Sequence, residues 1–101
     1  MNEMMVCTGF QNLSTSSTPA ALTIPTNANG DFAARAALIR AVGNNANYTL
    51  DGTTPTTSAG GGMPLNTADT NPIWIGNLAN LQRFLAVATT STGNITVLYF
   101  N

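Results

Sequence analysis

The stretch that decides the fold is Ile95-Thr96-Val97-Leu98-Tyr99-Phe100. Its residues are mostly β-branched or aromatic, and these types are enriched in strands. Similar short runs lie upstream, separated by turn residues at intervals of ~8–12 residues, which is the spacing of strands in a β-sandwich. We therefore predict an all-β protein with a single Ig-like or jelly-roll-like sandwich. The other predicted strands cover residues 20–24, 72–76 and 83–88, and a brief strand is an alternative for residues 63–65.

Residues 33–42 are ambiguous between helix and strand. Their alanines and Leu38 favour a helix by intrinsic propensity, and residues suited to helix caps stand on either side. The alternation of Leu38, Arg40 and Val42 with the residues between them fits a strand with one buried face. We predict a strand because the neighbouring stretches are strands.

The length of 101 residues corresponds to one domain. We place the β-sandwich domain at residues 20–101. Residues 1–19 are expected to form an N-terminal arm or an edge strand, and both alternatives stay open. This segment includes a Ser/Thr-rich linker at residues 14–19, because so polar a run buries little surface.

The charge content is unusually low. Charged residues make up 7% of the chain, and the formal net charge is -1, whereas typical soluble domains contain about 25% charged residues. Low charge removes the repulsion that keeps proteins monomeric, and charged residues are depleted at the cores of protein interfaces. The composition therefore predicts a homo-oligomer or a subunit packed among neighbours.

The same composition argues against several partners. The positive charges are three scattered arginines, Arg35, Arg40 and Arg83, too few to form a basic stripe for nucleic acid. No run approaches the ~20 apolar residues of a membrane span. The N-terminal stretch has no positive region, so we expect no signal peptide.

Catalysis is not expected. The chain contains no His, the usual general base at neutral pH, and no base lies near Cys7 in the sequence to activate its thiol. Asp51 and Asp69 are explained by a turn and a loop, respectively. A calcium site would need more oxygen ligands than the sequence around Asp69 supplies. We predict a protein that is not an enzyme, with no metal site and no cofactor.

The clearest local motif is Tyr48-Thr49-Leu50-Asp51-Gly52-Thr53-Thr54-Pro55-Thr56. Asp51 and Gly52 are predicted to form a type I′ hairpin turn, because both residue types tolerate the positive φ that this turn requires. The motif resembles the Tyr-Thr-Leu-Asp-Gly-(Ser/Thr)-x-Pro-Thr signature of Ig-like modules at the C-termini of chitobiase-type glycosidases.

The wider layout of residues 20–101 resembles small bacteriophage virion-associated β-sandwich proteins. The similarity lies in the strand at residues 22–25, the strand at 37–40, the hairpin motif, the segments 62–65 and 77–81, and the aromatic end of the last strand. The resemblance implies a non-enzymatic structural protein of the virion, assembled in the cytoplasm of the bacterial host. It would decorate or cement the capsid, or contact neck or tail proteins.

The contact residues of such a protein are expected at two places. One is the N-terminal segment, with Met4, Met5, Val6, Phe10 and Leu13, and the other is Trp74, flanked by Ile73 and Ile75. Three consecutive apolar residues in a strand predict that both of its faces are covered, which points to a partner.

A carbohydrate-binding module, on a phage spike or a glycosidase, is the alternative function. Trp74, Tyr48, Tyr99 and Phe84 would stack on sugar rings if they were exposed in a row. Core positions are the more common place for such residues, and we favour the core for them.

Overall fold

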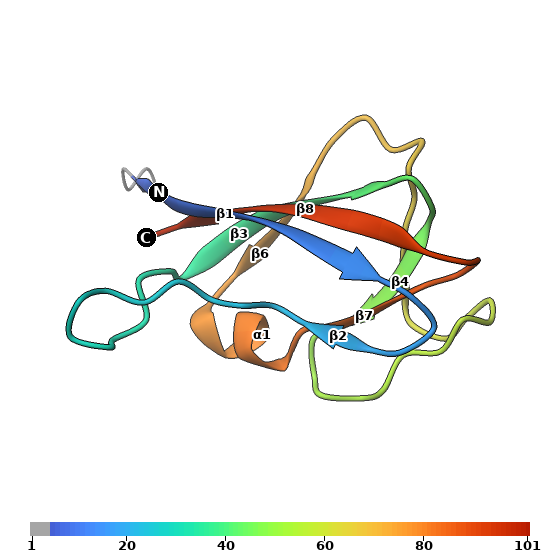
Figure 1. Ribbon diagram of the computed structural model, residues 1–101, viewed down its shortest axis with the longest axis horizontal. Helices are drawn as coiled ribbons and strands as arrows, with labels where there is room; N and C mark the ends of the chain where they lie inside the picture. Colours follow the sequence, from blue (N-terminus) through green and yellow to red (C-terminus); the bar gives the residue numbers. More distant parts are fainter. Residues whose placement is uncertain (1–4) are drawn as a thin grey trace.

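The computed structural model describes residues 5–101. Two antiparallel sheets of four strands each lie face to face (Figure 1), so the β-sandwich prediction is confirmed. Sheet A contains, in order across the sheet, β1 (Cys7–Thr15), β8 (Gly93–Phe100), β3 (Ala36–Val42) and β6 (Ile73–Gly76). Sheet B contains β2 (Ala20–Ala21), β7 (Leu85–Ala88), β4 (Ala46–Thr49) and β5 (Met63–Leu65).

The strands pair from the two ends of the chain inward. β1 pairs with β8, β2 with β7, β3 with β6, and β4 with β5. Pairing of β3 with β8 and of β4 with β7 completes the two sheets. This is the order of a jelly roll, in which eight strands form two Greek keys. An immunoglobulin sandwich divides its strands differently, so the chain has the jelly-roll form of the predicted sandwich.

The core lies between the two sheets and is built by alternation along the strands. In β8, Ile95, Val97 and Tyr99 are fully buried, whereas the residues between them are not. Sheet B contributes mainly small side chains, and Phe84 at the end of the helix fills the space beside them. The ring of Phe84 stacks on Tyr48 with a centroid distance of 5.7 Å.

The ambiguous segment at residues 33–42 forms strand β3, as predicted. Its Ala37, Ile39 and Ala41 are buried in the core. The only helix in the described part of the chain is α1 (Leu78–Arg83). It begins after Asn77, whose side-chain oxygen accepts a hydrogen bond from the N–H of Ala79 at 2.9 Å.

The predicted type I′ hairpin at Asp51 and Gly52 is wrong. Gly52 has a φ of +85°, but Asp51 does not adopt a positive φ, and type I′ needs both residues there. The Asp51 carboxylate instead accepts the N–H of Thr53 at 3.0 Å. The antiparallel partner of β4 is β5, where Met63 lies opposite Tyr48. A long loop over residues 50–62 therefore joins the two strands.

The N-terminal segment is part of sheet A. Strand β1 pairs with β8 from Cys7 to Thr15, so it runs into the stretch expected to be a linker. Leu13 and Thr15 are buried against the core side of the sheet. Strand β1 thus lies at the edge of sheet A.

Candidate interaction surface

The outer face of sheet A, the face turned away from the core, carries a continuous row of large apolar side chains. Phe10 lies opposite Leu98, Leu98 opposite Leu38, and Leu38 opposite Trp74. Residues directly opposite one another in antiparallel strands point to the same side of the sheet. The four residues, called the apolar row below, therefore cross the whole width of sheet A.

The apolar row is open to solvent. The exposed fraction is 64% for Phe10, 49% for Trp74 and 40% for Leu98, and Leu38 is half-buried. Phe100 extends the apolar surface, because its ring lies 5.6 Å from that of Trp74. Single exposed apolar residues are ordinary in proteins, but a contiguous patch indicates a contact site.

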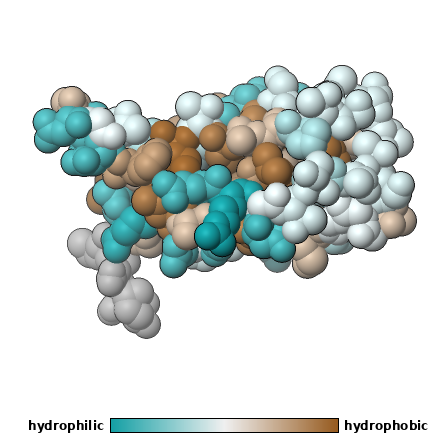
Figure 2. All heavy atoms as spheres, turned by 90° about the horizontal axis from the view of Figure 1, so that it is seen from below, coloured by the Kyte–Doolittle hydropathy of each residue, from teal (hydrophilic) through white to brown (hydrophobic). Residues whose placement is uncertain are grey.

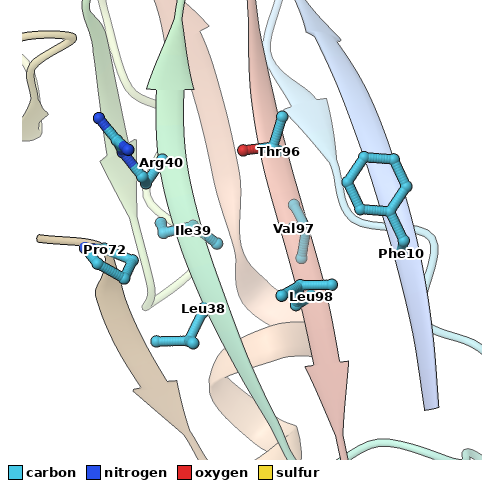
Figure 3. Close-up of a pocket in the computed structure, with 8 residues that line it drawn as sticks. All are labelled: Phe10, Leu38, Ile39, Arg40, Pro72, Thr96, Val97 and Leu98. Carbon is cyan, nitrogen blue, oxygen red and sulfur yellow. The ribbon is translucent and has the colours of Figure 1, made fainter. Parts of the chain in front are cut away.

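A shallow groove of about 360 Å³ runs along one side of the apolar row (Figure 3). Phe10 stands on one side of it and Pro72 on the other, with Leu38, Leu98 and Thr96 between them. Arg40 closes the groove on the side of Pro72, and its guanidinium donates to the main-chain oxygen of Asp69 at 2.9 Å. The groove thus has an apolar floor and one positive charge at its edge.

The outer face of sheet B, in contrast, is covered by the chain itself. Asn47 lies opposite Val87 on that face, and both residues are buried. The Asn47 amide donates to the main-chain oxygens of Thr56 and Ser58, at 2.9 and 3.0 Å. These bonds hold the 50–62 loop over the sheet.

Figure 2 shows the side of the molecule on which β2, β7 and α1 lie in Figure 1. The right-hand end, where the 50–62 loop lies in Figure 1, is pale, as expected for a loop rich in Thr, Ser and Gly. The 50–62 loop therefore gives this end of sheet B a polar cover, although apolar surface lies further left in the same view, and no loop of comparable length covers sheet A within the described residues. This asymmetry selects sheet A as the candidate interaction surface.

The residues predicted from the sequence as contacts fall into four groups. Phe10 and Trp74 lie in the apolar row, and Val6 and the half-buried Met5 precede β1 at the same end of sheet A. Met4 lies outside the described residues. Leu13 is a correction: it is 7% exposed and packs in the core, so its side chain is not available to a partner.

Sequence reasoning missed Leu38 and Leu98, which form the middle of the apolar row. In both strands, β3 and β8, apolar residues occupy the outward as well as the inward positions. Apolar residues on both faces of a strand indicate a second contact surface. The sequence prediction used this pattern only at Trp74.

The predicted preference of the aromatic residues for the core holds for three of the four. Tyr48, Tyr99 and Phe84 are buried, whereas Trp74 is exposed. These four side chains therefore do not make an exposed row for sugar rings. A depression beside Trp74 remains, bordered also by Arg35 and Asn77.

The groups considered for chemistry are dispersed. Cys7 is exposed on the edge strand, Asp51 lies in the 50–62 loop, and Asp69 lies near Arg40. The hydrogen bond from the N–H of Thr53 lowers the pKa of Asp51. Among residues 5–101, no three His, Cys, Asp or Glu side chains lie close enough together to hold a metal ion.

Comparison with known proteins gives no match to a protein-family model, to a curated protein or to a solved structure. Within the described chain, no helix has the length and apolar character needed to cross a membrane.

Proposed function

We propose that this protein is a structural component of a bacteriophage virion that acts by protein–protein contact and not by catalysis. The observation that supports it most directly is the uncovered apolar row on sheet A, which would be buried when the protein is assembled. The setting in a virion rests on the resemblance of residues 20–101 to phage virion-associated proteins. The jelly-roll topology agrees with it by analogy, since this fold recurs in viral capsid proteins.

The low charge supports the same function. A subunit that is surrounded by neighbours does not have to stay in solution alone, so it needs little surface charge. Removing water from an apolar face without charged residues also costs little free energy. In this face Arg40 is the exception, and its guanidinium already donates to a loop oxygen of its own chain. Arg is one of the residue types that most often contribute strongly to binding at interfaces.

The test is incorporation into particles. An epitope-tagged chain, expressed in cells that produce the phage, is expected to co-sediment with purified virions at a fixed copy number. Leu98→Thr should reduce that copy number, because it places a hydroxyl in the middle of the apolar row. Met63→Thr is the matched control, since Met63 is an exposed apolar residue in sheet B. Purified virions that do not contain the tagged wild-type chain would contradict the proposal.

Carbohydrate binding remains the second candidate, favoured by the exposed Trp74 beside Arg35 and Asn77. An exposed indole ring stacks on sugars, and planar polar side chains bond their hydroxyl groups. In that case Trp74→Ala should abolish binding on a glycan array and leave the midpoint of thermal unfolding nearly unchanged. No glycan signal from the wild-type chain would exclude the candidate for the glycans tested.

A further inference from the structure

We infer that the partner of the apolar row is a second copy of this chain, docked face to face through the outer faces of two A sheets about a two-fold axis that runs along the row in the plane between the two sheets. The inference rests on the proposed function, because it names the partner for the same surface. Three properties of the surface support it: its symmetry, its size and the position of its charge.

The apolar row is complementary to itself. It reads Phe10, Leu98, Leu38, Trp74 across the sheet, with an aromatic residue at each edge and Leu at the two central strands. A two-fold axis along the row places each of its residues over the same residue of the second copy, so that each Leu meets a Leu and each aromatic residue meets an aromatic residue. Such isologous contacts are the commonest form of dimer. The twist of packed sheets offsets facing strands by roughly 30°, which favours offset aromatic pairs.

The area is sufficient for a specific dimer. Sheet A is four strands wide, and β8 is 8 residues long. With a strand spacing of ~4.8 Å and a rise of ~3.4 Å per residue, the face covers roughly 500 Å². Two copies then bury about 1,000 Å², which lies at the lower limit of specific interfaces. A weak or moderate dimer is expected, which repetition in a particle would reinforce.

The charge on the face tolerates a second copy. Arg40 lies one outward position from Leu38, opposite Thr96. About the proposed axis, the two Arg40 residues would be roughly 14 Å apart in the plane of the sheets, because each lies two residues, about 7 Å, from the axis along its strand. At physiological salt that exceeds the screening length of ~8 Å.

The single Trp makes the inference directly measurable. Trp74 is the only tryptophan in the chain, and it lies in the apolar row. The full-length protein, with a reductant to prevent disulfides through Cys7, is studied by sedimentation velocity from about 1 µM to about 1 mM, a range that brackets weak dimers. We expect the mass to double with concentration. Trp74 emission should shift to shorter wavelength in parallel.

Two variants locate the contact. Leu98→Thr should weaken self-association at least tenfold, as expected for a residue at the centre of an interface. Met63→Thr should leave it unchanged. Circular dichroism checks that both variants keep the β spectrum of the wild type. If Leu98→Thr does not fold, the emission shift of the wild type still shows whether Trp74 becomes buried when the protein self-associates.

A monomer at every concentration would overturn the inference, and so would a dimer in which Trp74 emission stays unshifted. Neither result would by itself contradict the virion proposal, which is tested separately by incorporation. A monomeric protein that enters virions through the same face would assign that face to a different virion protein. A dimer that never enters virions would support the inference about the surface and contradict the proposed role in a virion.

Discussion

Leu98 and Leu38 lie opposite each other in the β8–β3 ladder, and both side chains point away from the core of their own domain. Their neighbours along the two strands, Val97 and Ile39, are opposite each other too and are fully buried. Two apolar layers therefore lie back to back across sheet A. One layer stabilises the fold, and the other is free to meet a partner.

The first prediction separates the two layers by stability. Val97→Ala should lower the free energy of unfolding by about 2 kcal/mol, because it removes methyl groups from a closely packed core. Leu98→Ala should lower it by less than about 1 kcal/mol, since the side chain is already partly in water. Urea unfolding at low protein concentration, where self-association is absent, measures both. Equal losses for the two variants would mean that the outer layer is packed like a core.

The second prediction concerns the edge strand β1. Leu13→Ala is expected to cost about 2–5 kcal/mol, as for other buried Leu residues. Phe10→Ala, three residues earlier on the outer face, should change stability much less and instead reduce particle incorporation. The fragment 20–101 should fail to fold, because it lacks the strand that pairs with β8. A well-folded fragment, with a cooperative unfolding transition, would show that β1 is dispensable.

These two strands also show how far the sequence determines the fold. The closing strand was predictable because β-branched and aromatic residues, which favour strands, follow one another in it. The segment that forms β1 was left open between an arm and an edge strand, because Ser14 and Thr15 continue it with residues typical of loops. Thr15 is nevertheless buried within the sheet. Burial of this kind depends on pairing with β8, almost 80 residues away, which a local pattern does not contain.

The candidate surface was only partly predictable for a related reason. In β3, Ala37 and Ile39 face the core while Leu38 faces outward. Both sets are apolar, so alternation alone does not say which set is buried. Phe10 and Trp74 were recognised as contacts, but the row that unites them exists only through the register of four strands. The hairpin prediction at Asp51 and Gly52 was wrong for a similar reason. The strand that pairs with β4 is β5, which starts eleven positions after Gly52 and not directly after the turn.

The third prediction concerns the loop that covers sheet B. Asn47→Ala removes the amide that donates to Thr56 and Ser58. The loss should cost about 1–3 kcal/mol, because a buried hydrogen-bonding network is opened. Amide exchange in residues 53–62 should accelerate. Asn44→Ala is the control, because it removes an exposed hydrogen bond from the side-chain amide to the main-chain oxygen of Thr92. It should leave amide exchange in the 50–62 loop unchanged. Unaltered exchange in Asn47→Ala would mean that other contacts hold the loop.

The last prediction concerns alkaline pH. Burial raises the pKa of Tyr99 from 10.0 to about 12, and its hydroxyl donates to the Gln11 side chain at 2.5 Å. Below pH 10 the phenol is neutral in both the folded and the unfolded chain, so its contribution to stability is complete. Between pH 10 and 12 the unfolded chain ionises first and binds fewer protons than the folded chain, so stability falls as pH rises.

Tyr99→Phe tests this directly. The variant should be less stable at pH 7 by about 1 kcal/mol, because it loses one hydrogen bond. It should also lose less stability between pH 10 and 12 than the wild type, since one raised phenol is absent. Some alkaline loss should persist, because burial raises the pKa of Tyr48 as well. Urea unfolding at a series of pH values measures the two slopes. Parallel slopes would mean that Tyr99 ionises as easily in the folded protein as in the unfolded chain, which is incompatible with a phenol sealed between the two sheets.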